Sequence, residues 1–219
     1  MLKIKYKIKE YSNQIFVIIV PNSYVRAMLF LRIQEFYESK NKMFRNKGFS
    51  FWDYKEWYSR QNGLSFTYTK DWGGFNVPLK VALRCKEVSK EETPYDKEMN
   101  KILCKIKRKA KKNSYIIGVD SVKSQTFMHE ISHALYNTDK SYKKRMDSIT
   151  SSLNTKKLRS LSKYLREMGY CEKVIKDELQ AYLSTEKGSW YPAKKASVPL
   201  ETIRRYKNVF KNWYINLIE

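Results

Sequence analysis

Residues 127–136 read FMHEISHALY and contain both of the chain's histidines, His129 and His133. Residues four apart on an α-helix point from the same face, one turn above the other, so the two imidazoles can bind a single metal ion. Glu130 follows the first histidine. A carboxylate at that position can act as the general base toward a water molecule at the metal. The stretch therefore predicts a helix that carries a metal site.

This helix is expected to have two distinct faces. At about 100° per residue, its apolar side chains form one arc, and they are Phe127, Met128, Ile131, Ala134 and Leu135. The midpoint of His129 and His133 lies opposite the centre of that arc. A histidine that only packs in a core is expected inside the arc, so the pattern favours metal binding. Glu130 falls at the margin between the two faces, where it can reach a water molecule without becoming a ligand.

A third ligand must come from a carboxylate. Zinc in a catalytic site takes three protein ligands and leaves one position for water. The three cysteines are widely spaced, and no histidine remains. Glu178 lies in a predicted helix over residues 172–185, between apolar or aromatic neighbours at −4, −3, +3 and +4, namely Val174, Ile175, Ala181 and Tyr182. A carboxylate in an apolar stripe is costly unless it is paired or metal-bound, so Glu178 is the expected ligand.

Asp177 is expected to have a different role. It lies beside Lys173 and Gln180 on a more polar side of the same predicted helix. A carboxylate there is suited to accept a hydrogen bond from the ring N–H of a metal-bound histidine.

These residues resemble the gluzincin branch of the zincin metallopeptidases. The matching pieces are His129-Glu130-Ile131-Ser132-His133 and Glu178-Leu179-Gln180-Ala181, within residues 115–185. The resemblance implies a Zn²⁺-dependent endopeptidase in which His129, His133 and Glu178 hold zinc and Glu130 activates water. It also implies a side chain that stabilises the oxyanion, for which Tyr182 and Tyr191 are candidates. The implied substrate is a protein or peptide.

A metzincin-like arrangement is the alternative for the third ligand. Asp139 lies six residues after His133, where that branch carries its third ligand. That branch has a glycine three residues after the second histidine, and this chain has Tyr136 there. The bulky residue disfavours the turn that Asp139 would need.

The net charge of the chain suggests a second class of function. The 219 residues carry a formal net charge of +22, which attracts polyanions such as nucleic acids. Residues 105–112, from Lys105 to Lys112, hold six basic side chains in eight. The alternative is therefore a nucleic-acid-associated basic protein with a structural metal, or a protease recruited to DNA. Most of the basic residues are lysines, however, and specific readers of nucleic acids rely on arginine, so we expect only weak binding.

The fold expected is α+β: a zincin-like domain with an N-terminal sheet, a cleft strand and a mainly helical C-terminal half. We expect one domain over 1–219, with an α/β part over 1–112 and a metal-site part over 113–219. Residues 3–9 and 14–20 should pair as a hairpin, and Asn62-Gly63 should turn into a strand over 64–69. Residues 115–120 should form the cleft strand, with a free edge for an extended substrate. Helices are expected over 22–37, 94–112, 158–168, 172–185 and 200–217.

The same sequence gives an expectation about location. The longest early apolar run, residues 15–20, ends before Pro21 and is too short for a signal-peptide core or a membrane span. An odd number of scattered cysteines fits a reducing compartment. We therefore expect a cytoplasmic or other intracellular protein, with a nuclear location compatible and no membrane partner.

Overall fold

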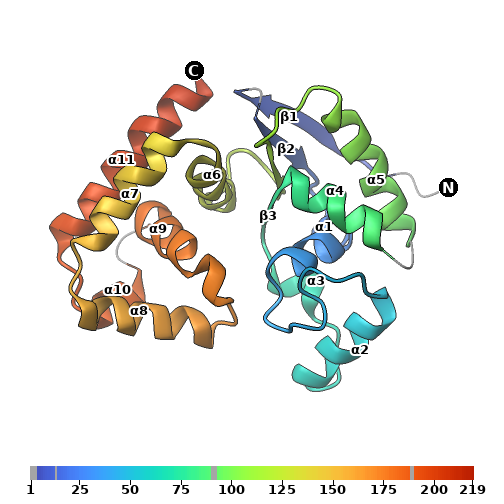
Figure 1. Ribbon diagram of the computed structural model, residues 1–219, viewed down its shortest axis with the longest axis horizontal. Coiled ribbons are helices and arrows are strands. Elements are labelled where there is room, and N and C mark those ends of the chain that lie inside the picture. The colour runs from blue at the N-terminus through green and yellow to red at the C-terminus, as the bar shows by residue number, and fades with distance from the viewer. Residues whose placement is uncertain (1–3, 13, 90–92, 188–189) are drawn as a thin grey trace. The chain divides into compact units, whose positions relative to one another are not determined.

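The computed structural model describes residues 4–12, 14–89, 93–187 and 190–219. The chain divides into two compact units, Met1–Phe127 and Met128–Glu219, and the division falls inside the helix that carries the histidines (Figure 1). The α+β class is confirmed, because the first unit contains a mixed sheet and both units contain helices. The expectation of one domain over 1–219 stays a prediction.

The sheet of the first unit has four strands in the order β1-β2-β4-β3. β1 (Lys7–Tyr11) and β2 (Ile15–Ile19) form the expected antiparallel hairpin. β2 runs parallel to β4 (Tyr115–Val119), which in turn pairs antiparallel with β3 (Phe75–Pro78). All five residues of β4 are buried. Its uninterrupted apolar run is typical of a strand covered on both faces.

The free edge predicted for residues 115–120 is wrong. Ile117 of β4 pairs with Val17 on one side and with Asn76 on the other. β4 therefore offers no unpaired edge to an extended peptide. The prediction failed because β3 is only four residues long and follows Gly73-Gly74, which favoured a loop.

The hairpin and strand predicted over residues 62–69 are also wrong. Gly63 has φ of +61° and follows α2 (Phe51–Gln61), where the N–H of Leu64 donates to the carbonyl of Ser59. An Asn-Gly pair serves a helix C-terminus as well as a hairpin, because both need positive φ. Residues 68–71 then form α3 (Tyr68–Asp71), in which Tyr68 is buried.

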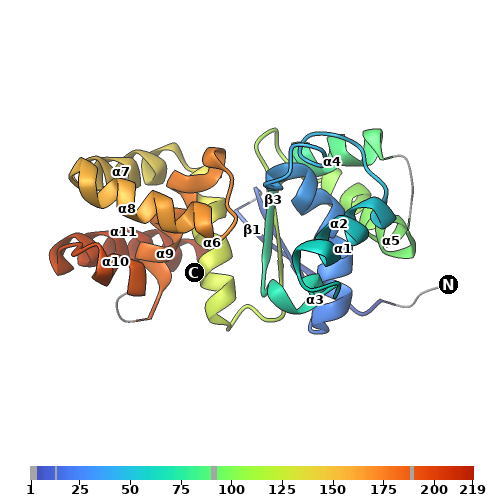
Figure 2. The ribbon, with the colours of Figure 1, turned by 90° about the horizontal axis from the view of Figure 1, so that it is seen from below.

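Three further helices of the first unit lie on one face of the sheet in Figure 2. α1 (Ser23–Glu38) is capped by Asn22, whose side chain accepts a hydrogen bond from the N–H of Val25. α4 (Leu79–Val88) was not predicted. α5 (Pro94–Lys107) ends before residue 112, where the sequence predicted its end, so residues 108–112 lie outside the helix.

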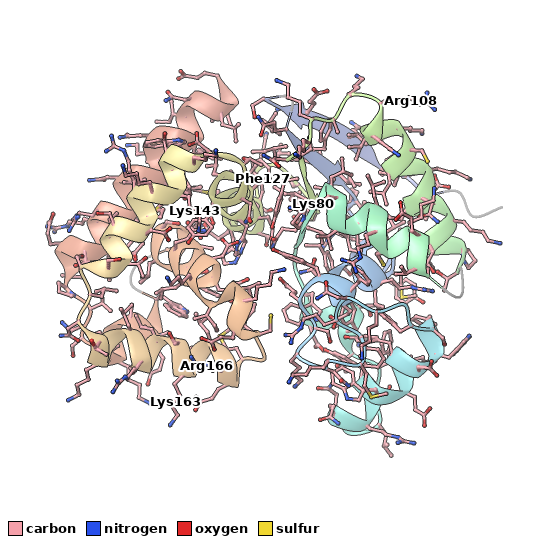
Figure 3. All side chains as sticks on the ribbon, viewed as in Figure 1. Lys80, Arg108, Phe127, Lys143, Lys163 and Arg166 are labelled. Atoms are coloured by element: carbon pink, nitrogen blue, oxygen red, sulfur yellow. The ribbon has the colours of Figure 1, made fainter. Side chains whose placement is uncertain are left out.

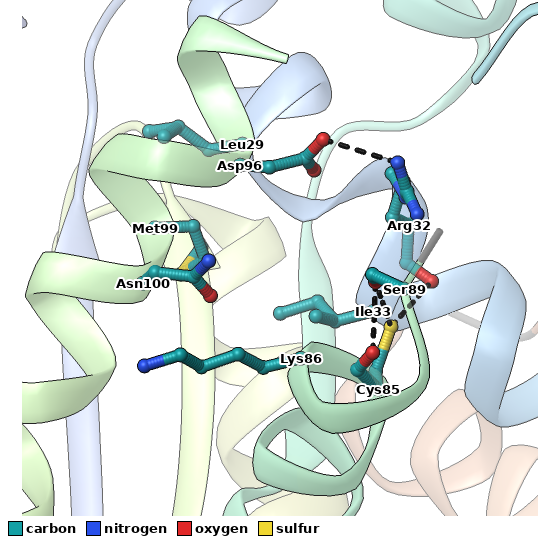
Figure 4. A pocket seen from close by; sticks show the side chains of 9 residues that line it. All are labelled: Leu29, Arg32, Ile33, Cys85, Lys86, Ser89, Asp96, Met99 and Asn100. Carbon is teal, nitrogen blue, oxygen red and sulfur yellow. Dashed lines mark hydrogen bonds and ion pairs between the residues drawn. The ribbon is translucent and has the colours of Figure 1, made fainter. Parts of the chain in front are cut away.

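A buried ion pair joins α1 to α5. Arg32 Nη1 lies 3.3 Å from Asp96 Oδ2, with 4 % and 13 % of the two side chains exposed. Asp96 also accepts a hydrogen bond of 2.7 Å from the N–H of Thr93 and so caps α5. Figure 4 shows this pair beside Cys85 in a small pocket among α1, α4 and α5. Removing one partner of such a pair would leave an uncompensated buried charge and destabilise the protein.

The second unit is helical over its described residues. Its helices are α6 (Gln125–Thr138, which begins in the first unit), α7 (Lys140–Ser151), α8 (Thr155–Glu167), a short 3₁₀ turn (Glu172–Val174), α9 (Ile175–Thr185), α10 (Tyr191–Lys195) and α11 (Leu200–Ile218). α9 packs against α7, α8 and α11 (Figure 1). α8 ends at Glu167, and Gly169 follows with φ of 102°. Within the described ranges, every helix is too short or too polar to cross a membrane.

Candidate metal centre

α6 presents the two histidines toward α9. The apolar arc is buried as expected at Ile131, Ala134 and Leu135. His133 is also buried, at 2 % exposure, and Glu130 is at 5 %. The histidine face is therefore distinct from the apolar arc but is not a solvent face, because polar side chains of α9 lie against it.

The structure brings together the three ligands that the sequence predicts. His129 Nε2 and His133 Nε2 lie 3.2 Å apart. The carboxylate of Glu178 faces both rings, with Oε1 3.5 Å from His133 Nε2 and Oε2 3.7 Å from His129 Nε2. Among the described residues, these are the His, Cys, Asp and Glu side chains that form a group able to hold a metal ion.

These distances fit a tetrahedral ion. Zinc lies about 2.0–2.2 Å from histidine nitrogen and carboxylate oxygen, which places two tetrahedral ligands about 3.3 Å apart. The distance between the two Nε2 atoms is close to that value, whereas Glu178 approaches the two rings through different oxygens, and one ligand atom from each of the three residues lies within 4.8 Å of the others. Oε2 of Glu178 is buried and has no hydrogen-bond partner in the described part of the chain. Leaving such an oxygen unsatisfied is costly, and a cation among these three groups would remove the cost.

Asp177 sets the orientation of His133, as the sequence predicted. Its Oδ1 lies 2.8 Å from His133 Nδ1. The side chains of Asn137 and Gln180 donate to the same carboxylate at 2.8 and 3.1 Å. An ionised carboxylate accepts only, so Nδ1 carries a proton, and Nε2 is the ring nitrogen that would bind a metal ion once it is deprotonated. Asn137 and Gln180 had not been assigned a role from the sequence.

His129 is held by residues of α9. Its Nδ1 lies 3.5 Å from Oγ1 of Thr185, whose hydroxyl donates to the carbonyl of Ala181. The ring of Tyr182 lies edge-on to the imidazole, with 4.8 Å between centroids. His129 is the most accessible of the three ligands, with 16 % of its side chain exposed against 2 % for His133 and 4 % for Glu178.

The field at this site attracts positive charge. Burial lowers the pKa of His133, but the charges of Glu178 and Asp177 and the hydrogen bond to Asp177 outweigh it and raise the pKa to about 10. Glu130 contributes to the same field. Without a metal ion, the site holds a proton on His133 at neutral pH. A metal ion must displace this proton to bind.

Glu130 lies beside the ligand group and outside it. Its side chain is buried, and its charge acts on both His133 and Tyr182. Tyr182 is thus close to the site, whereas Tyr191 is 68 % exposed. A role of Glu130 as a general base stays a prediction.

Asp139 has other partners. Its Oδ1 accepts hydrogen bonds from the N–H groups of Ser141 and Tyr142, at 2.8 and 2.9 Å, and so caps α7. Its Oδ2 accepts a bond of 2.9 Å from Nε1 of Trp213. Both oxygens are used away from the histidines, so the structure gives the metzincin-like arrangement no third ligand at this residue.

Within the described part of the chain, the basic residues of 105–112 do not converge on a binding site as the three predicted metal ligands do. Lys105 donates to the hydroxyl of Tyr6 at 2.8 Å, and Nζ of Lys109 lies 4.0 Å from a carboxylate oxygen of Glu10. The basic side chains of the segment are exposed. Nucleic-acid binding stays a prediction.

Comparisons with known proteins add no relative. No protein-family model, curated protein or solved structure matches this chain.

Proposed function

We propose that the chain is a zinc-dependent metallopeptidase of the gluzincin kind. One observation carries the proposal: Nε2 of His129, Nε2 of His133 and the carboxylate of Glu178 converge, while Asp177 holds the proton of His133 on the far side of its ring. The support lies in this constellation and in the spacing of residues 129–133. The zincin-like domain belongs to the same proposal, and no matching solved structure supports it.

Each residue has a distinct task in this proposal. His129, His133 and Glu178 hold the ion, and Asp177, with Asn137 and Gln180, fixes the ring of His133. Bound zinc supplies a Lewis acid, which polarises the scissile carbonyl and lowers the pKa of water.

Glu130 acts as the general base and acid. Its carboxylate takes a proton from the attacking water and passes the proton to the leaving amine, so one residue serves both halves of the hydrolysis. Its burial next to the ligand group keeps bulk water from competing for that proton.

A structural metal is the less favoured function. Structural zinc sites are closed by four protein ligands, whereas catalytic sites use three. The group in the described part of the chain has three members. Three ligands leave a position for water or substrate, which favours catalysis over a purely structural ion.

The test compares wild-type and Glu130→Gln protein, both loaded with zinc, on a peptide library derived from a digested proteome. Loss of one general base costs about 10²- to 10⁴-fold in rate, so new termini should arise with wild-type protein and largely disappear with the variant. Glu172→Gln is the matched control, because Glu172 is exposed and paired with Arg166. Equal zinc content in all three proteins is required. Equal cleavage by wild type and Glu130→Gln would refute the assigned mechanism.

A further inference from the structure

Four partly exposed aromatic rings form a connected group that contacts His129 through Tyr182. They are Tyr164, Tyr170, Tyr182 and Trp190, and we refer to them as the aromatic wall. Each is intermediate in burial, unlike the fully buried rings of this unit, such as Tyr142 and Tyr206. Large aromatic surface left partly exposed beside a candidate site is a common feature of ligand recognition.

Helix geometry places the wall beside the metal ligands. Tyr182 lies four residues after Glu178 on α9, so both side chains leave the same face of the helix. Its ring contacts His129, at 4.8 Å between centroids. His129, which this ring contacts, is the most exposed of the three predicted ligands.

The rings support one another. Trp190 stacks on Tyr182 with 4.7 Å between centroids and 10° between planes. Tyr164, on α8, meets Trp190 edge-on at 5.8 Å, and the hydroxyl of Tyr170 lies 3.0 Å from that of Tyr182. The rings come from α8, the segment after it, α9 and the residue before α10. Mutual contacts of this kind hold a preformed surface, which binds a ligand with less loss of side-chain entropy.

We propose that the aromatic wall is a specificity subsite that binds an aromatic side chain of the peptide, at a residue flanking the scissile bond. The inference rests on the proposed peptidase function and adds the class of substrate. A flat apolar ring can pack on the exposed parts of Trp190 and Tyr182, whereas a small or charged side chain gains little there.

Binding tests the subsite independently of turnover. The probes are two peptides that differ only by Phe or Ala at one residue, titrated into zinc-loaded Glu130→Gln protein. The Phe peptide should bind about tenfold more tightly. Trp190→Ala in the same background should bring the ratio of affinities toward one, and Trp190→Phe should retain most of it. Tyr191→Ala is the matched control, because this neighbouring ring is 68 % exposed and lies outside the wall.

Each outcome decides a separate claim. Equal binding of the two peptides, or a ratio that survives Trp190→Ala, would overturn the subsite. A purely structural role for Trp190 would weaken both peptides equally and lower zinc content or Tm, leaving the ratio unchanged. If the Phe peptide is preferred but wild-type protein cleaves neither peptide nor the library, the subsite stands and the peptidase function fails. Cleavage without enrichment of aromatic residues beside the cut bonds would count against the subsite alone.

Discussion

Asp177 and Glu178 are adjacent in sequence, yet their carboxylates meet opposite sides of the same imidazole. Asp177 contacts Nδ1 of His133, and Glu178 faces Nε2. Successive side chains on a helix diverge by about 100°, which allows this division of tasks. The apolar neighbours of Glu178 made its place in the ligand group predictable from sequence. Asn137 and Gln180 carried no comparable signal, because polar residues at these spacings are common on helices.

Glu178→Ala should lower the affinity for zinc by orders of magnitude, since it removes one of three ligands. Asp139→Ala should keep zinc bound and cost about 1 kcal/mol of stability, because it removes the cap of α7. Competition with a chromophoric chelator measures both affinities. Zinc loss in Asp139→Ala, with zinc retained in Glu178→Ala, would favour the metzincin-like arrangement.

The metal-free protein should lose stability as the pH rises from about 6.5 to about 10. The pKa of His133 is raised to about 10 in the folded protein, so protonation favours folding. This contribution is complete below the unfolded pKa, about 6.5, and disappears as the pH passes the folded value. Urea unfolding of chelator-treated protein across this range measures it. His133→Gln should flatten the slope, and an unchanged slope in that variant would contradict the assignment.

At the scale of elements, the buried runs and helix caps were predictable, and the short or ambiguous pieces were not. The strand over residues 115–119 is an apolar run that only a buried strand explains well. β3 has only four residues, and it forms a strand because it pairs with β4. The sequence of these four residues does not predict that pairing. Asn62-Gly63 fixes positive φ but does not distinguish the end of a helix from a hairpin.

Gly118 of β4 should be intolerant of a side chain. A Cβ there would overlap the ring of Phe30 on α1, where the helix packs on the sheet. We expect Gly118→Ala to destabilise the protein by about 1–3 kcal/mol, the usual cost of overpacking. Chemical denaturation measures this.

Gly73→Ala is the matched control for Gly118→Ala. The nearest atom to its added Cβ is 3.5 Å away, an ordinary contact with Thr126. This variant should change stability little. Equal effects of the two substitutions would show that close packing of α1 on β4 is not the reason for the glycine.

At the scale of the whole molecule, the net charge of +22 supports the main alternative to a catalytic function, which is nucleic-acid binding. Exposed basic side chains occur in both units, as at Arg108 after α5 and Lys163 on α8 (Figure 3). Exposed lysines that do not converge on a binding site attract nucleic acid through their charge alone, and salt screens this attraction.

We therefore expect weak nucleic-acid binding whose affinity falls steeply between about 50 and 200 mM salt. Fluorescence anisotropy with duplex DNA and single-stranded RNA measures it. Replacing the basic residues of 105–112 by glutamine should weaken binding only in proportion to the charge removed. Tight binding at physiological salt that depends on this segment would instead support a protease recruited to nucleic acid.

The central claim is that three side chains of the second unit hold one zinc ion. The most direct measurement is the metal content of purified wild-type protein after exhaustive dialysis, by elemental analysis. The proposed site should hold about one zinc per chain, and Glu178→Ala should lose it. Wild-type protein that is metal-free, fails to take up added zinc and keeps its full thermal stability would contradict it.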